Sequence, residues 1–344
     1  AAHPEGALDL SIGSPVDPSP EVIAEPLAHT DARSYPATAG SGALREEISV
    51  WYARRRGVTA SPQVVLPTVG SKELVALLPF LLGIGPGEAV VHPRIAYPSY
   101  AMGAALVGAE AIAEDDPALW PAHTRLVWIN SPSNPDGRVL GVEQLRAAVS
   151  RARELGAVIV GDECYAEFGW AEPWNDEPIP SLLDPRVVGE KHEGVLAAYS
   201  LSKQSNMAGY RAAFVAGDET LIDRLLPVRK PAGLMPPAPV QAAMVAALGD
   251  EAHVDEQRER YRVRREVLLP ALEAAGWRVD GSEAGIYLWV TRGEDAWQSV
   301  AAFADLGIIV GPGHFYGEHS PNHVRLSLTA PDSDIARAAE RLRV

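Results

Sequence analysis

The stretch Tyr199–Arg211 reads Tyr-Ser-Leu-Ser-Lys-Gln-Ser-Asn-Met-Ala-Gly-Tyr-Arg, and it continues the apolar run Gly194–Tyr199. The apolar run predicts a short buried strand. Lys203 follows the strand beside two serines, and Arg211 stands eight positions further on. A lysine at a strand end, with hydroxyls and an arginine nearby, suits a Schiff-base nucleophile next to a phosphate site. A lysine that only extends from the strand end into solvent explains the same residues equally well.

Composition restricts the classes of protein to which the chain can belong. With 344 residues, 47% of them hydrophobic, the chain is long enough for one large and one smaller domain. It has no apolar run long enough for a membrane span and no signal-peptide pattern, so we expect no membrane partner. A net charge of −15 argues against nucleic acid as a partner. The single cysteine, Cys164, excludes an internal disulfide and a cysteine-based metal cluster, and it favours a cytoplasmic protein without a metal.

A Gly-Ser turn in the N-terminal half predicts a phosphate site. The run Val64–Val69 predicts a strand, and Gly70, Ser71 and Lys72 lead from it into an apolar helix that ends near Leu82. Backbone N–H groups at a helix start, together with the helix dipole, favour phosphate, and glycine lets the anion approach. The alternative for Ser71 is an ordinary helix N-cap.

Two further predicted strands end in polar residues. The strand over 124–130 leads into a loop that contains Asn134 and Pro135, where we expect a cis peptide bond. The apolar strand that starts at Ala157 ends at Asp162. A buried carboxylate needs a partner, and a protonated pyridine nitrogen would provide one. The alternative for Asp162 is a cap on the following turn. Sites in open parallel sheets lie beyond the carboxyl ends of strands, which is where these residues stand.

The motifs together resemble the class I aminotransferases, which are pyridoxal 5'-phosphate enzymes of fold type I. Ser-x-Ser-Lys-x7-Arg is similar to the cofactor-lysine signature of that family, and the other motifs occur in the family's order over nearly the whole chain. The resemblance implies an α/β fold with a doubly wound, mostly parallel sheet. It places a large cofactor-binding domain at residues 31–245 and a smaller α/β domain at residues 1–30 and 246–344.

The resemblance also implies a role for each site residue. Lys203 would bind the cofactor covalently and move the catalytic proton, Asp162 would pair with the ring nitrogen, and Tyr97 would lie over the ring. Tyr100, in contrast, is expected only to pack. The ring oxygen would be contacted by Asn134 and Tyr165. The phosphate would be held by Gly70, Ser71, Lys72, Ser200 and Arg211, and by Tyr35 from the partner subunit of a homodimer. Arg325, with Gly13 nearby, would bind the substrate α-carboxylate.

Within the family, the chain is most similar to the actinobacterial N-succinyldiaminopimelate aminotransferases, through residues 161–165, 200–211 and 283–289. This similarity implies a small-molecule amino acid and keto acid pair: N-succinyl-L,L-diaminopimelate, a precursor of lysine, with 2-oxoglutarate and glutamate. The alternative is an aspartate-like or broad-specificity class I aminotransferase. We expect Lys230, helped by Arg229 or Lys72, to bind a distal substrate carboxylate, the alternative being a solvated surface lysine.

A rival function comes from the same stretch. Residues Ser200–Lys203 also fit Ser-x-x-Lys, the acylation motif of penicillin-binding proteins and class A β-lactamases. Such an enzyme also needs a Lys-Thr-Gly strand, and none of the four lysines precedes Thr-Gly. Lys203 moreover follows a predicted strand, whereas the acylation motif begins a helix. We therefore reject a Ser-x-x-Lys hydrolase.

Overall fold

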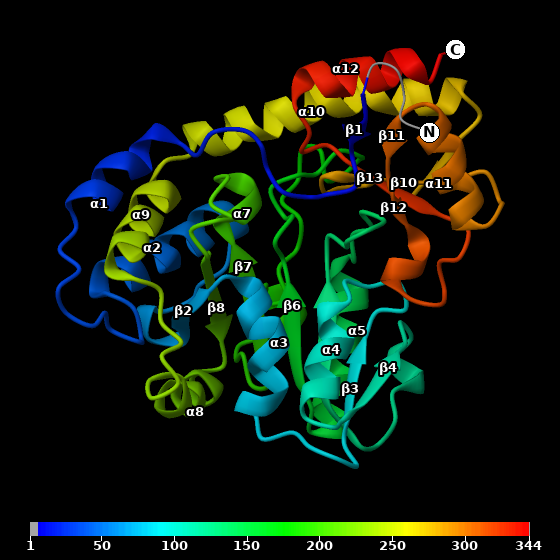
Figure 1. The fold of residues 1–344 in the computed structure, drawn as a ribbon. Helices are drawn as coiled ribbons and strands as arrows, with labels where there is room; N and C mark the ends of the chain where they lie inside the picture. The colour runs from blue at the N-terminus through cyan, green and yellow to red at the C-terminus, as the bar shows by residue number, and fades with distance from the viewer. Residues whose placement is uncertain (1–5, 344) are drawn as a thin grey trace.

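The computed structural model describes residues 6–343, and a seven-stranded sheet lies at its centre (Figure 1). Strand β8 is antiparallel to both of its neighbours, and all the other neighbouring strands are parallel. The strands, in spatial order, are β2 (Val65–Val69), β8 (Ala212–Gly217), β7 (Val195–Ser200), β6 (Val158–Asp162), β5 (Thr124–Asn130), β3 (Ala89–His92) and β4 (Glu110–Ala113).

Helices cover both faces of this sheet, which explains why its central strands are apolar on both sides. In β7, Val195, Ala197 and Tyr199 face one hydrophobic core, whereas Leu196 and Ala198 face the other. The first core includes residues of α2 (Gly42–Trp51), α5 (Val142–Leu155) and α9 (Ala238–Gly249). The second includes residues of α3 (Ser71–Leu81), α4 (Ser99–Leu106) and α8 (Glu219–Arg229). The predicted doubly wound α/β fold is confirmed.

A smaller unit contains the C-terminal part of the chain and lies beyond the carboxyl ends of β5, β6 and β7 (Figure 1). Its antiparallel sheet has the order β12 (Gly311–Pro312), β13 (Val324–Ser327), β10 (Tyr287–Thr291) and β9 (Arg278–Asp280). Strand β1 (Leu8–Asp9) pairs in parallel with β11 (Ile308–Ile309). The core of this unit also takes residues from α10 (Ala252–Ala274), α11 (Ala296–Asp305) and α12 (Asp332–Arg341).

The predicted domain boundaries stay a prediction, but one segment assigned to the smaller domain packs elsewhere. Helix α1 (Ala24–His29) lies against α9, and Ile23 and Leu27 join a core of the large sheet. Strand β1, further toward the N-terminus, pairs with the smaller unit. The N-terminal segment therefore runs from one unit to the other, and it passes Lys203 and Arg325 on the way.

Most predicted elements agree with the structure, with differences at their ends. Helix α2 ends at Trp51 and continues directly as a π-helix over Tyr52–Arg56. The peptide bond before Pro135 is cis, as predicted. Strand β4 and helices α4, α11 and α12 were not predicted. Within residues 6–343, no helix is both long and apolar enough to cross a membrane.

Candidate active site

A pocket of about 760 Å³ lies at the carboxyl ends of β5, β6 and β7, and residues of the smaller unit also line it. It brings together eleven residues that the sequence singled out. They are Gly13, Ser71, Lys72, Tyr97, Asn134, Asp162, Tyr165, Ser200, Lys203, Arg211 and Arg325. Gly70 does not line the pocket itself, but a side-chain Cβ at this position would lie 2.1 Å from Nη2 of Arg211. Glycine is therefore required there for the arginine to lie against the turn.

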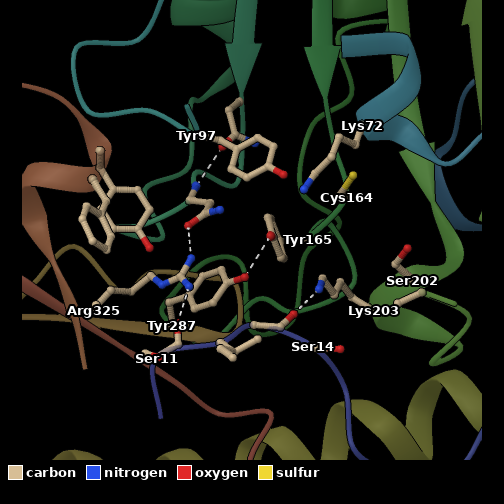
Figure 2. Close-up of a pocket in the computed structure, with 18 of the residues that line it drawn as sticks. Ser11, Ser14, Lys72, Tyr97, Cys164, Tyr165, Ser202, Lys203, Tyr287 and Arg325 are labelled. Atoms are coloured by element: carbon tan, nitrogen blue, oxygen red, sulfur yellow. Dashed lines mark hydrogen bonds between the residues drawn. The ribbon is translucent and has the colours of Figure 1, made fainter. Parts of the chain in front are cut away.

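Lys203 lies on the short helix α7 (Leu201–Gln204), directly after β7. Ser200 caps this helix by accepting a hydrogen bond from the Ser202 N–H at 3.2 Å. The amine of Lys203 points into the pocket and donates to the backbone oxygen of Gly13 (Figure 2). The sequence argument that no helix begins at this motif was wrong, because the strand runs straight into one. The rejection of a Ser-x-x-Lys hydrolase now depends on the missing Lys-Thr-Gly strand.

Asp162 lies at the end of β6 with its carboxylate buried in the pocket. Its Oδ2 accepts a hydrogen bond from the Tyr100 hydroxyl at 2.8 Å, and its Oδ1 accepts one from the Cys164 N–H at 3.4 Å. Burial raises the pKa of Asp162 above its ordinary value, and the hydrogen bonds from Cys164 and Tyr100 limit that rise. The carboxyl group is therefore buried in the pocket with two hydrogen-bond donors.

Tyr100 corrects the expectation that it only packs. Its ring does pack, stacked on Trp128 with a centroid distance of 5.3 Å. Its hydroxyl, however, is a hydrogen-bond donor to Asp162. Cys164, which lies between Asp162 and Tyr165 in the chain, is also buried, and its thiol contacts the Ser71 hydroxyl with an S···O distance of 3.5 Å.

Two tyrosines and an arginine form a cluster on the side of the smaller unit (Figure 2). The hydroxyls of Tyr165 and Tyr287 are 3.3 Å apart, and the guanidinium carbon of Arg325 lies 4.0 Å from the centroid of the Tyr287 ring. Burial alone would raise the pKa of Tyr287. The positive charges of Arg325 and Lys203, together with the hydrogen bond from Tyr165, outweigh burial and lower that pKa. Tyr287 was not predicted as a site residue.

Arg325 connects the cluster to the large sheet. Its Nη1 donates to Oδ1 of Asn134 at 2.9 Å, and its Nη2 donates to the backbone oxygen of Ser11 at 2.7 Å. Its Nε is buried and has no hydrogen-bond partner within residues 6–343. The Asn134 N–H donates to Oδ1 of Asn130, whose amide donates to the backbone oxygen of Asp162. Strands β5, β6 and β13 thus position one another's site residues.

An anion-binding end is formed by the start of α3 and the segment after β7. Helix α3 begins at Ser71, so its first backbone N–H groups have no carbonyl partner within the helix. The Lys72 amine lies 5.4 Å from the centroid of the Tyr97 ring. Arg211, whose Nη1 donates to the Ala208 oxygen at 2.7 Å, lies against Gly70. These cations and helix N–H groups favour a phosphate.

Besides Gly70, three residues named from the sequence do not line the pocket. Tyr35 is 99% exposed, and Lys230 is exposed at the end of α8. Arg229 is fully buried and forms two hydrogen bonds to Glu73, at 2.8 and 2.9 Å. The expectation that Arg229 helps to bind substrate was wrong, because its guanidinium is occupied by this ion pair. Within the described part of the chain, no cluster of three or more His, Cys, Asp or Glu side chains is arranged to hold a metal ion.

Comparisons with known proteins agree with this geometry. The model of the family "Aminotransferase class I and II" matches residues 5–342. The aminotransferase OxyQ of Streptomyces rimosus, a 4-dedimethylamino-4-oxo-anhydrotetracycline transaminase, is 55% identical over 99% of this chain and 94% of its own. The probable aminotransferase Rv1178 of Mycobacterium tuberculosis is 52% identical over 99% of this chain and 81% of its own.

Two further relatives extend the comparison. The LL-diaminopimelate aminotransferase of Desulforudis audaxviator is 34% identical over 98% of this chain and 89% of its own. A solved aminotransferase structure from Staphylococcus aureus superposes with a TM-score of 0.90 at 26% identity, covering 99% of this chain and 94% of that one. The chain belongs to the class I and II aminotransferases, pyridoxal-phosphate enzymes that exchange an amino group between amino acids and keto acids.

Proposed function

We propose that this aminotransferase exchanges the amino group between N-succinyl-L,L-diaminopimelate and 2-oxoglutarate, and that it works as a homodimer. The observation that supports the transamination reaction is the convergence of Lys203, Asp162 and Arg325 on one pocket. Two facts support the carbon skeleton of the substrate: the sequence resemblance described above, and the relatives named LL-diaminopimelate aminotransferases at 30–34% identity.

The pocket fits pyridoxal phosphate at both ends. At one end, Gly70 leaves room for the Arg211 guanidinium beside the start of α3, which is a cradle that a side chain at residue 70 would fill. At the other end, the carboxylate of Asp162 is buried with two hydrogen-bond donors. A molecule with a phosphate at one end and a protonated ring nitrogen at the other satisfies both charges. Lys203 lines the same pocket and would hold the aldehyde carbon.

Each of the pocket residues would then have its own role in the reaction. When bound, pyridoxal phosphate supplies a ring that accepts the electron pair released at the substrate α-carbon. Asp162, buried at the end of β6, would keep the proton on the ring nitrogen. Tyr165 and Asn134 would hold the ring through its oxygen, and Tyr97 would lie against the ring. The Lys203 amine would move the proton between the substrate α-carbon and C4′ of the cofactor.

Arg325 would bind the substrate α-carboxylate. Its present acceptors are neutral oxygens of Asn134 and Ser11, and its Nε is buried without a partner in the described chain. A carboxylate satisfies a guanidinium better than neutral oxygens do, because the two can form a pair of charge-assisted hydrogen bonds. Gly13 lies beside this position, where a Cβ would be 2.0 Å from the Tyr287 hydroxyl oxygen.

The homodimer would complete the site with residues that lie outside the pocket of their own chain. Tyr35 projects from its loop with 99% of its surface exposed, as expected if it reaches the phosphate of a partner subunit. Lys230 is exposed next to the loop that follows α8. Across the dimer its flexible amine would bind a distal carboxylate of the succinylated substrate. Lys72, which lines the pocket, is the second candidate for this carboxylate.

The test compares purified holoenzyme on N-succinyl-L,L-diaminopimelate, L,L-diaminopimelate and aspartate, with 2-oxoglutarate as acceptor. We expect the succinylated substrate to have the highest kcat/KM. Lys230→Ala should lower that value by about 5- to 150-fold, the cost of one charged hydrogen bond, and should leave turnover of a substrate without a distal carboxylate unchanged. The exposed Lys191→Ala is the matched control. Equal kcat/KM for all three donors would contradict the proposed substrate.

A second candidate is amination of a polycyclic ketone. It is favoured by the 55% identity to OxyQ, whose name describes transamination of an oxo-anhydrotetracycline, over nearly the full length of both chains. The same assay decides between the candidates if an oxo-anhydrotetracycline is tested as amino acceptor with glutamate. A kcat/KM above that for the succinylated substrate would favour the second candidate.

A further inference from the structure

The mouth of the pocket is apolar. Four large hydrophobic side chains line the pocket and are still half exposed: Ile12 (60%), Ile309 (46%), Trp297 (53%) and Phe315 (58%). We call these four residues the apolar rim. They come from the N-terminal segment, from β11, from α11 and from the 3-10 helix Gly313–Tyr316. Scattered exposed hydrophobic residues need no explanation, but a group around one cavity marks a binding surface.

The rim offers packing surface and little free charge. The rings of Trp297 and Phe315 meet edge to face with centroids 6.2 Å apart. His314 and Asp295 lie beside them and face each other, with Nε2 of His314 3.4 Å from Oδ2 of Asp295. The other carboxylate oxygen of Asp295 caps α11 by accepting a hydrogen bond from the Trp297 N–H at 2.9 Å. Val300 and Pro312 continue the apolar lining.

The rim also lies next to the cation that would bind a substrate carboxylate. Tyr316 follows Phe315 in the chain, and the centroid of its ring is 5.1 Å from the guanidinium carbon of Arg325. Ile12 follows Ser11, whose backbone oxygen accepts a hydrogen bond from Arg325. A substrate anchored by its carboxylate on Arg325 therefore has apolar side chains within reach on two sides.

We propose that the apolar rim is a subsite for an apolar, ring-bearing side chain of an amino or keto acid whose α-carboxylate lies on Arg325. The proposal rests on the aminotransferase reaction and not on the succinylated substrate. The step balances without an external oxidant or reductant. Glutamate loses its amino group and becomes 2-oxoglutarate, while the C=O of the ring-bearing keto acid becomes CH–NH₃⁺. The ring packs against Trp297 and Phe315, where aromatic contacts add to the burial of apolar area.

The test measures kcat/KM of the holoenzyme with glutamate and two keto acids that differ only by a phenyl ring, 2-oxo-4-phenylbutanoate and 2-oxobutanoate. We expect the wild type to prefer the phenyl compound by about tenfold or more. Phe315→Ser should remove most of this preference. The matched control is Phe80→Ser, because Phe80 is 62% exposed but lies away from the pocket, and it should keep the preference.

Several results would overturn the proposal. The first is a wild-type enzyme that shows no preference for the phenyl compound or uses neither keto acid. The second is a Phe315→Ser variant that loses the same factor on both. The third is weaker self-association of Phe315→Ser by sedimentation, with the preference intact, which would assign the rim to an interface between two copies of the chain. Failure on N-succinyl-L,L-diaminopimelate with the phenyl preference present would reject only the proposed substrate.

Discussion

Removing the Tyr100 hydroxyl tests how the buried carboxylate is held. In Tyr100→Phe, Oδ2 of Asp162 loses the donor that lies 2.8 Å away, and the ring still fills the space against Trp128. A hydrogen bond to a charged group contributes ~1.5–3 kcal/mol, so the variant apoprotein should lose that much free energy of unfolding at neutral pH. Urea unfolding followed by circular dichroism measures the loss.

The pH dependence gives the sharper result. Burial raises the pKa of Asp162 above its ordinary value in the folded protein. Because the hydrogen bond stabilises the ionised carboxylate, its loss costs most above that pKa, and the cost shrinks as the pH falls through it. The pKa of Asp162 rises further in the variant, so the difference in stability between the two apoproteins should disappear as the pH falls.

The matched control for this experiment is Tyr52→Phe. Tyr52 is also fully buried, but its hydroxyl has no hydrogen-bond partner within residues 6–343. Removing it should change the free energy of unfolding by less than ~0.5 kcal/mol, or should stabilise the protein slightly. If Tyr100→Phe behaves like this control, or loses the same stability at every pH, the Tyr100 hydroxyl does not stabilise the ionised Asp162 carboxylate.

Gly13→Ala should lower kcat/KM by about 10- to 100-fold, because the new Cβ would lie 2.0 Å from the Tyr287 hydroxyl oxygen. Adding Tyr287→Phe should restore part of the lost kcat/KM. An unchanged kcat/KM in the single variant would contradict this close packing. Arg56→Met should cost ~3–5 kcal/mol in urea unfolding, because it leaves Glu163, 3.2 Å away and 3% exposed, charged and unpaired. Combining Arg56→Met with Glu163→Gln should recover part of the lost free energy of unfolding. An equal loss in the double variant would show that the unpaired Glu163 charge is not its cause. Hydrogen bonds from Arg278 and His323 outweigh burial and lower the pKa of Asp280 from 3.8 to about 2. Asp280→Asn should therefore lower the free energy of unfolding at pH 7 by about 1 kcal/mol, after allowance for solvent screening. That stability is present above the unfolded pKa and is lost as the pH falls toward 2, so thermal melts of the two proteins should converge near pH 2; a constant difference would exclude the linkage.

The strands that end in Asn130, Asp162 and Ser200 were predictable because each is a continuous apolar run buried on both faces. Parallel strands bring their carboxyl ends to one edge, so the main site residues follow from the strand ends. Helix α4 was missed because its short sequence is apolar on all sides and so has no polar face that would indicate a helix. It packs so closely on α3 that a Cβ at Gly103 would lie 2.9 Å from the Val75 oxygen. The contact between Tyr100 and Asp162, 62 positions apart, depends on where that helix packs.

The cluster around Arg325 shows a second limit. Tyr287 pairs with Ser327 across β10 and β13, which makes it a diagonal neighbour of Arg325 on the same face of the sheet. A slip of one residue in this register would put Tyr287 on the opposite face, and the sequence pattern of β10, which is buried throughout, does not distinguish the two. The positions of Tyr35 and Lys230 toward the site depend on a second subunit, so their roles stay predictions.

The identity of the cofactor lysine is the most direct measurement to make, because every proposed role is defined around the Lys203 amine. The holoenzyme, reconstituted with pyridoxal phosphate, is reduced with borohydride and digested, and the peptides are mapped by mass spectrometry. We expect the pyridoxyl label on Lys203, in the peptide that contains Ser200-Leu-Ser-Lys203, and we expect Lys203→Ala to take no label. A label on Lys72, Lys191 or Lys230 in the wild type would contradict this assignment.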